Sequence, residues 1–454
     1  ILHRLVGSEM CIRDRLFVAS YVGMLPSDYD LYKNNCTEGS DPSTCYRAVP
    51  QVDFGAGNDQ LKNDGVVVGP GESPTGNYLE LVLGSGNDSF INHGYLGCLT
   101  SGADSGGWNG NVGQNTCEDA AVLVGGGLSQ SNDLKHNYNV NLLFQGGDDQ
   151  FFNYGYLRGH VNMGGRNDEL ISEGGIRGGI VMGAGNDTLT IMQTNTWNGS
   201  GIVDDYIALG SARKSDSGSE SDLNRLNLRG QTEIAFRNSV GFNSTNCGDK
   251  EIRQGQGGYG CRWSEDGGYN YLAISGSNGQ DQIVISAGDV LSAGQLSTTK
   301  IWGSVELGGF TDSLELEPNT HLDLVGDLSM GSGESQVITI SQDADFSVRS
   351  IHGDVDLTID GISSLGGDQV LSLYTPDPGS ELGQRNTLSS YTGTTTVNDN
   401  GILRAAQPWS LSYRSPHHVD GNLIIGDGNL REDQQIAELT GKGSVYLGNQ
   451  SHLF

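Results

Sequence analysis

The sequence has no long hydrophobic run and little positive charge, and these two absences exclude several classes of protein. No stretch approaches the roughly 18 consecutive apolar residues that a membrane-spanning helix needs. The 25 Lys and Arg face 55 Asp and Glu, a formal net charge of −30, so nucleic acid and anionic membrane surfaces are unfavourable partners. Hydrophobic residues make up 35% of the chain, which is low for a globular enzyme but suits a thin solenoid with a narrow core.

Cysteine is also scarce, and its spacing argues against a metal site. The sequence contains neither a Cys-x-x-Cys pair nor a Cys/His cluster. Apart from Cys11, the cysteines form three pairs of sequence neighbours around polar loops: Cys36 with Cys45, Cys98 with Cys117, and Cys247 with Cys261. We expect these pairs to be disulfides, with free thiols or a metal site as alternatives, and hence an exported, oxidising location.

Glycine is abundant, with 70 residues, and it marks a repeat without the three-residue period of collagen. The segments 142–149, 161–168 and 180–187 superpose so that Asp149, Asp168 and Asp187 lie 19 residues apart. Each Asp follows a Gly-rich turn and is flanked on both sides by apolar residues at strand spacing. A fixed period of this length fits one coil of a solenoid.

The same frame recurs outside this stretch, around Asp59, Asp88, Asp281 and Asp312. Equivalent apolar positions then fall above one another, so that stacked coils share a core which no single coil could bury. The apolar residues of these further coils are Val52, Phe54, Leu61, Leu81, Leu83, Phe90, Ile274, Ile283, Val305, Leu307 and Leu314, and a second apolar position follows at Val67, Leu96, Leu157 and Ile176. The prediction is an all-β chain forming a parallel β-helix with loop insertions, right-handed because parallel crossovers nearly always are.

The frame also divides the chain into segments. We expect 1–15 to be an artefact, because residues 5–15 resemble a translated sequencing-adapter peptide. The remaining predicted segments are a lead-in at 16–50, β-helix with Gly-Asn-Asp coils at 51–196, an irregular loop-rich insertion at 197–270, β-helix at 271–375, and a last β-helical section at 376–454. The insertion is either an elaborated coil with long loops or a small subdomain, and it is where we expect a specialised binding surface.

The last section carries a resemblance to a known family. The segment Asn386–Ala406 resembles the passenger-associated transport repeat of bacterial autotransporters, with a pattern near N-x-Y-T-G-x-T-T-V-N-x-G-x-L. The matching positions are Tyr391, Thr392, Gly393, Thr395, Thr396, Val397, Asn398, Gly401 and Leu403. Two departures fall at turns: Asn386 lies too far from Tyr391, and Asp399-Asn400 puts two residues where the pattern has one.

The resemblance implies a fragment of an extracellular passenger of type V secretion, truncated at both ends. Such a passenger is displayed at the cell surface or secreted, and is anchored through an outer-membrane β-barrel, which we expect to be missing from this chain. The favoured hypothesis is a non-catalytic adhesin or structural shaft, with a host or neighbouring-cell protein or glycan as partner. We expect a monomer that binds no nucleic acid.

One alternative is a calcium-binding, RTX-like secreted protein. Gly183–Leu189 resembles the RTX nonapeptide, and a 19-residue coil would stack the loops of Asp149, Asp168 and Asp187 on one edge. Met163 and Met182 stand where that nonapeptide has its leading Gly, and the opposite half-coils carry no acid. The other interpretation is a turn ladder in which Asn and Asp bond backbone amides; a chelator-sensitive melt distinguishes the two.

The second alternative is a β-helical carbohydrate-active enzyme, which an activity screen on polysaccharides would reveal. No catalytic residue is assigned, because no nucleophile–base constellation stands out in the sequence. Ala103–Gly107 resembles the surround of a chymotrypsin-like Ser but lies within a cysteine loop, and we interpret it as chance in a Gly-rich chain. We expect His417 and His418 to lie in a surface loop, and no cofactor is assigned.

Overall fold

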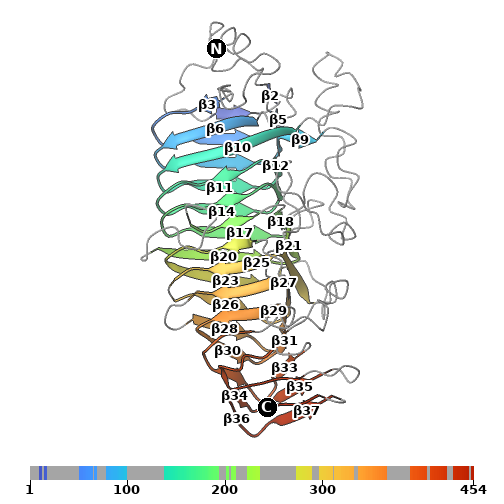
Figure 1. The fold of residues 1–454 in the computed structure, drawn as a ribbon. Coiled ribbons are helices and arrows are strands. Elements are labelled where there is room, and N and C mark those ends of the chain that lie inside the picture. Colours follow the sequence, from blue (N-terminus) through green and yellow to red (C-terminus); the bar gives the residue numbers. More distant parts are fainter. Residues whose placement is uncertain are drawn as a thin grey trace, which may run out of the picture.

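The computed structural model shows a long stack of β-strands that follow one another in chain order from one end to the other (Figure 1). Every regular element in its described part is a β-strand. Within that part, no helix has the length and apolar character needed to cross a membrane. The structure describes residues 10–12, 15–17, 51–64, 66–68, 78–99, 137–193, 201–203, 206–210, 222–235, 272–288, 296–309, 311–331, 336–365, 389–405, 410–426, 433–448 and 451–454.

One wall of the stack is a single parallel sheet of 14 strands, here called sheet A. Every coil contributes one strand, and each pairs only with its counterparts in the coils before and after it. Its strands, in spatial order, are β1 (Met10–Ile12), β4 (Gln60–Asn63), β7 (Ser89–Asn92), β11 (Gln150–Asn153), β14 (Glu169–Ser172), β17 (Thr188–Met192), β20 (Leu223–Arg229), β23 (Gln280–Ser286), β26 (Ser313–Leu316), β28 (Gln336–Ile340), β30 (Val355–Ile359), β32 (Thr395–Val397), β34 (Pro416–Val419) and β36 (Glu438–Thr440).

The other strands form two further parallel ladders. Ladder B follows sheet A in each coil and consists of β2 (Arg15–Phe17), β5 (Val66–Val68), β8 (Tyr95–Leu96), β12 (Tyr156–Arg158), β15 (Gly175–Arg177), β18 (Ile202–Val203), β21 (Thr232–Ala235), β24 (Ser297–Trp302), β27 (Thr320–Met330), β29 (Asp345–Gly353), β31 (Ile362–Leu365), β33 (Ile402–Ala405), β35 (Asn422–Ile425) and β37 (Ser444–Leu447).

Ladder C precedes sheet A in each coil. It consists of β3 (Gln51–Asp53), β6 (Tyr78–Ser85), β10 (Asn137–Gly146), β13 (Val161–Asn162), β16 (Ile180–Val181), β19 (Ile207–Ala208), β22 (Leu272–Ser275) and β25 (Ser304–Leu307), followed by the second halves of β27 and β29. The long strands β27 and β29 turn the corner without a break and therefore join ladders B and C. β9 (Cys98–Leu99) pairs antiparallel with β10.

The register confirms the predicted coil length. Leu142 pairs with Val161 and Val161 with Ile180, while Leu170 pairs with Leu189, in both cases across 19 residues. In the coils outside this stretch, the apolar positions that the sequence aligns also pair with one another: Val52 pairs with Leu81, and Ile283 pairs with Leu314. The chain is a parallel β-helix, as the sequence predicted.

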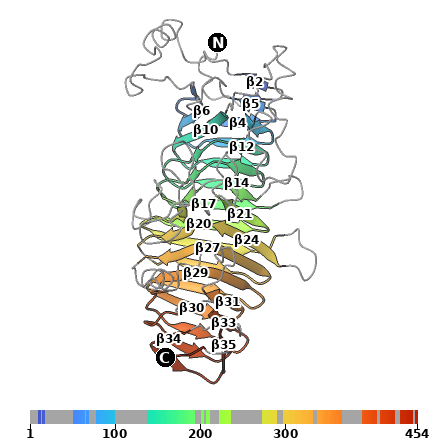
Figure 2. The same ribbon diagram turned by 45° about the vertical axis from the view of Figure 1, so that its right-hand side comes forward.

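The core is a single column of apolar side chains that runs along the inside of the coils. Figure 2 shows the stacked coils that enclose it. Strands such as β14 and β17 alternate buried and half-buried positions, which a strand with one dry face requires. Phe151, Leu170 and Leu189 lie in successive coils and are fully buried. Such stacked burial stabilises each coil through its neighbours.

The segment 197–270, expected to be irregular, contributes coil strands where the structure describes it. β18 and β21 lie in ladder B, β19 in ladder C and β20 in sheet A, so the ladders continue across this segment. Its apolar frame is hard to see in the sequence because long intervals separate the strands.

Several predictions concern residues outside the described part. These are the segment 18–50, the loop containing Ala103–Gly107, and the side chains of the three proposed cysteine pairs. At the start of the chain, β1 lies in the segment interpreted as adapter-derived, and it pairs with β4. The exposed edge of a sheet accepts any extended chain, so this backbone pairing carries no information about the origin of residues 1–15.

Candidate functional site

The Gly-Asn-Asp turns form a column of buried carboxylates at the corner between ladder C and sheet A. In each coil the backbone N–H of the Asp donates to the Oδ1 atom of its counterpart in the next coil. The bonds run from Asp59 to Asp88 (2.8 Å), Asp88 to Asp149 (2.8 Å), Asp149 to Asp168 (2.9 Å), Asp168 to Asp187 (2.9 Å), Asp187 to Asn224 (3.2 Å) and Asp281 to Asp312 (2.9 Å). We call this set the Asp column.

A second column lies beside it on the exposed side of the same turns. It consists of Asn58, Asn87, Asp148, Asn167 and Asn186, whose Oδ1 atoms accept backbone N–H groups at 2.7–3.2 Å. Here the N–H of each coil donates to the preceding coil, whereas in the Asp column it donates to the following one. In the turns at 87–88, 148–149, 167–168 and 186–187, the two adjacent residues therefore tie a coil to both of its neighbours.

A third polar column turns the next corner, where sheet A ends. The Nδ2 group of Asn63 donates to Asn92 (2.7 Å), Asn92 donates to Asn153 (2.8 Å), and Asn153 donates to the Oγ atom of Ser172 (3.0 Å). All four side chains are fully buried. Buried amides satisfied by their own stack remove the desolvation cost that isolated amides would carry.

Burial raises the pKa of the carboxyl groups in the Asp column. The pKa rises to about 6 at Asp149, about 8 at Asp168 and about 7 at Asp187 and Asp312, because desolvation disfavours the charged form. The backbone N–H bonds act in the opposite direction, and the neighbouring carboxylates raise the pKa further at Asp168. The Oδ2 atoms of these four residues are buried without a hydrogen-bond partner.

The Asp column was the candidate calcium site, and its geometry corresponds to the turn-ladder alternative. One oxygen of each carboxylate accepts a backbone N–H. Calcium prefers six to eight oxygen ligands. Among the described residues, no group of three or more His, Cys, Asp or Glu side chains is placed to hold a metal ion. The column therefore acts on the backbone of adjacent coils.

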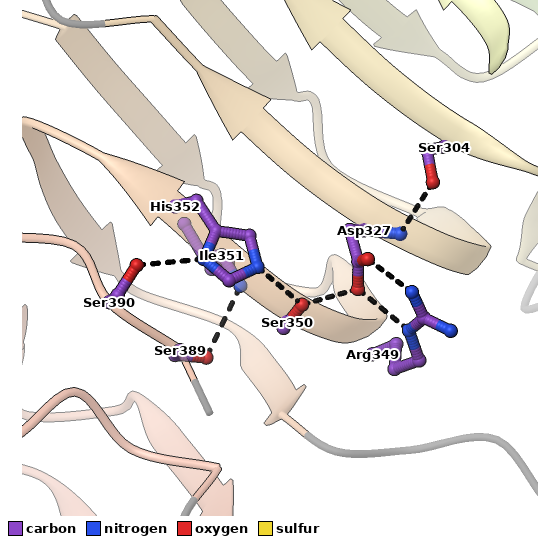
Figure 3. Close-up of polar contacts among 8 residues, drawn as sticks. All are labelled: Ser304, Asp327, Arg349, Ser350, Ile351, His352, Ser389 and Ser390. Atoms are coloured by element: carbon purple, nitrogen blue, oxygen red, sulfur yellow. Dashed lines mark hydrogen bonds and ion pairs between the residues drawn. The ribbon is translucent and has the colours of Figure 1, made fainter. Parts of the chain in front are cut away.

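The structure also brings together a polar cluster that the sequence did not reveal (Figure 3). We call it the His352 cluster; its members are Asp327 on β27, Arg349, Ser350 and His352 on β29, and Ser390, which follows 38 residues later. The backbone N–H groups of Ser390 and Thr392 donate to the carbonyls of Ile351 and Gly353 at 2.9 and 3.0 Å. The chain around Ser390 is thereby fixed alongside the end of β29.

Hydrogen bonds connect the members of the His352 cluster in one continuous line. Arg349 donates from Nε (2.6 Å) and from Nη2 to the Asp327 carboxylate, and the Ser350 hydroxyl donates to the same carboxylate. Ser350 Oγ lies 2.9 Å from His352 Nε2, and His352 Nδ1 lies 2.8 Å from Ser390 Oγ. Arg349 and Ser350 are buried, whereas Asp327, His352 and Ser390 are half-buried.

The protons in this line fix the tautomer of His352. A hydroxyl has a single proton, and that of Ser350 is used on Asp327, so Ser350 can only accept from the ring. His352 Nε2 must then carry the proton, which leaves Nδ1 as the acceptor for the Ser390 hydroxyl in the neutral ring. Desolvation lowers the pKa of His352, opposed by Asp327 and assisted by Arg349. The arrangement is a serine hydroxyl bonded to an oriented base.

The prediction of a loop at His417 and His418 is wrong for both residues, and that of a surface position is wrong for His417. Both residues lie on β34, and His417 pairs with Thr395 on the inward-facing side, where it is 1% exposed. Burial lowers its pKa to about 4, and Nδ1 lies 2.9 Å from the Ser415 carbonyl oxygen. The neighbour His418 faces outward and contacts Thr440 at 3.0 Å. Strand alternation alone separates the two environments.

The sequence contained one signal for His417 and hardly any for the His352 cluster. Alternation through Pro416–Val419 places residue 417 on the same side as the buried Val419, which the adjacent proline obscured. The His352 cluster depends on pairing Asp327 with Ser350 and on a contact across 38 residues, so only the register reveals it.

Comparison with known proteins does not assign the chain to a family. No family model matches the chain, and neither a curated protein nor a solved structure gives a significant match.

Proposed function

We propose that this chain is a surface-displayed passenger of type V secretion, a β-helical shaft that contacts a protein or glycan on a host or neighbouring cell. The observation that carries the proposal is the continuous parallel β-helix, in which the segment resembling the transport repeat occupies one regular coil. An acidic shaft with 55 Asp and Glu suits an outer surface without nucleic-acid partners.

The residues that carry the resemblance have definite structural roles in that coil. Tyr391 is fully buried, and its hydroxyl lies 2.8 Å from Thr395 Oγ1, which in turn lies 3.1 Å from Ser415 Oγ. A side chain at Gly393 would stand 2.2 Å from the carbonyl oxygen of Val355, so only glycine fits there. These residues of the transport-repeat pattern therefore serve the packing of the coil, which supports a role in folding.

The role in folding follows from the way coils stack. β32 pairs with β30 before it and β34 after it, and Val397 is buried between Ile359 and Val419. A folded coil presents a ready edge and an apolar face to the next segment, so folding can proceed along the chain. In a passenger emerging from a membrane pore, such progressive folding favours outward movement.

Secretion of the chain behind a signal peptide and ahead of an outer-membrane translocator tests this proposal. We expect the 454-residue chain to become accessible to protease added outside intact cells. Val397→Asp places a carboxylate in the core at a cost of several kcal/mol and should leave the chain inside the cell. Thr396→Asp is the matched control, because Thr396 lies on the same strand with its side chain half-exposed.

Surface accessibility of the two variants decides the secretion part of the proposal. Equal export of Val397→Asp and Thr396→Asp, or retention of the parent chain, would overturn it. Adhesion is tested separately with the purified chain on cells and immobilised glycans. Saturable binding that a heated, unfolded sample lacks is the expected result; equal binding by both samples counts against an adhesin.

A further inference from the structure

We propose that Ser390 is an activated nucleophile that takes the acyl group of short-chain esters, with His352 as its general base. The site goes beyond a passive shaft and does not depend on how the chain is exported. It also departs from the expectation, drawn from the sequence, that the chain lacks catalytic activity. Three features of the His352 cluster carry the inference: contact, orientation and access.

Contact is direct between the nucleophile and the base. Ser390 Oγ lies 2.8 Å from His352 Nδ1, within the range at which a base removes a proton. The backbone of Ser390 is held by its N–H bond to the Ile351 carbonyl (2.9 Å), and the adjacent Ser389 Oγ accepts the N–H of Ile351 at 3.2 Å. The hydroxyl is thus presented to the ring from a fixed strand edge.

Orientation comes from a chain of hydrogen bonds that ends in an ion pair. Ser350 stands between the ring and the Asp327 carboxylate, and Arg349 holds that carboxylate from its other side. A base oriented by a third group is the general design of activated nucleophiles. Here the carboxylate acts through a hydroxyl, so Ser350 and Asp327 are positioning residues.

Access and the surrounding chemistry define the substrate class. His352 pairs in register with Ser329, which is half-buried, and Ser329 pairs with the exposed Glu306. On the other side of Ser390, Asp354 is exposed and accepts a hydrogen bond from the Thr392 hydroxyl at 2.9 Å. Among the described residues these outward-facing neighbours are polar, so a small acyl group on a polar alcohol fits, whereas a long acyl chain finds no apolar wall.

The proposed step balances in atoms and protons. Ser390 Oγ bonds to the ester carbonyl carbon while its proton moves to His352 Nδ1. The carbon–oxygen bond to the alcohol then breaks, and the leaving alcohol takes that proton from Nδ1. Water hydrolyses the acyl-serine through the same base, which restores Ser390 and releases the carboxylic acid.

Reaction of the full chain with a fluorophosphonate probe, followed by peptide mass spectrometry, tests the proposal. We expect Ser390 to be labelled faster than half-buried serines outside the cluster, such as Ser364, and p-nitrophenyl acetate to acylate the same residue. His352→Gln should slow labelling about 10²–10⁴-fold, the usual contribution of a general base. Ser390→Ala should abolish it, whereas the control Ser364→Ala, at a half-buried serine outside the His352 cluster, should retain it.

The pH profile provides a test that needs no variant. The ionisable groups around His352 are Asp327, Arg349 and, two coils away in register, Glu306. Labelling should rise as the ring loses its proton, with a midpoint below pH 6.5, and Ser350→Ala should slow labelling and shift that midpoint. Labelling of Ser390 no faster than Ser364, or a wild-type rate in a folded His352→Gln variant, would overturn the proposal.

Discussion

At the residue scale, the Asp column makes stability depend on pH in an unusual direction. The pKa of Asp168 is about 8 in the fold, against an ordinary value of 3.8. Between these values the folded chain holds a proton that the unfolded chain has lost, so the free energy of unfolding falls as pH rises. Most buried acids with cationic partners behave in the opposite way.

Asp168→Asn tests this linkage directly. The amide keeps an oxygen for the Asp149 N–H and cannot ionise, and the chain itself uses Asn224 in the equivalent position beside Asp187. We expect the parent melting temperature to fall by roughly 5 °C between pH 5 and pH 9, and the variant to melt above the parent at pH 9. Thermal melts monitored by circular dichroism provide the measurement.

The control for this substitution is Asp356→Asn, at an exposed carboxylate outside the Asp column that accepts the Thr394 N–H. That variant should keep the pH dependence of the parent, because its carboxylate faces solvent. Parallel melting curves for the parent and Asp168→Asn at every pH would contradict the raised pKa.

At the element scale, the turns depend on close approach between the backbones of successive coils. Gly183 has φ of +111°, and a Cβ atom there would lie 1.8 Å from the Gly164 carbonyl oxygen. The strain of the left-handed backbone adds to that clash. We expect Gly183→Ala to lower the free energy of unfolding by roughly 3 kcal/mol.

Urea titration of Gly183→Ala and a matched glycine variant checks this prediction. Gly146→Ala is the control: its added Cβ would meet nothing within 4 Å, and its backbone is outside the left-handed region. The control should unfold within about 0.5 kcal/mol of the parent. Equal free energies of unfolding in the two variants would contradict the close approach and the backbone strain at Gly183.

The same turns explain how much of the fold the sequence reveals. A coil of constant length repeats its apolar and Asn-Asp positions at a fixed interval, so the coils around Asp149, Asp168 and Asp187 were predictable. Beyond Asp187 the intervals vary: the next members of the Asp column, Asn224 and Asp281, lie 37 and 57 residues further on. Because the number of residues between successive coils varies, the sequence alone does not show which residues of those coils are in contact.

The His352 cluster and His417 are features that the sequence patterns did not locate. Neither Ser350 nor Ser390 belongs to a motif. Ser350 contacts His352 from two residues away on the same strand, whereas Ser390 contacts it across 38 residues, from the next coil. His417 follows ordinary strand alternation, yet a histidine beside proline resembles a surface turn. Sequence patterns locate strands by what they bury, whereas a polar site is specified by which coils are adjacent.

At the scale of the whole molecule, stability should depend on how many neighbours a coil has. Leu170 and Leu189 in the middle of the stack are fully buried, while Tyr446 and Leu447 on β37 are 55% and 53% exposed. β37 pairs with β35 on one side, and no described strand covers its other side. A coil with one neighbour lacks one of the two interfaces that stabilise it.

Amide hydrogen exchange of the 454-residue chain measures this gradient. Opening free energies in such an array approach the global value in the middle and fall towards a coil with a single interface. We expect the amides of β14 and β17 to exchange at least about 10³-fold more slowly than those of β37, which corresponds to about 4 kcal/mol. β35, with a neighbour on both sides, should be intermediate. Uniform protection from β14 to β37 at low protein concentration would mean that the stack opens as one unit, and the account of coils stabilising one another in sequence would fail.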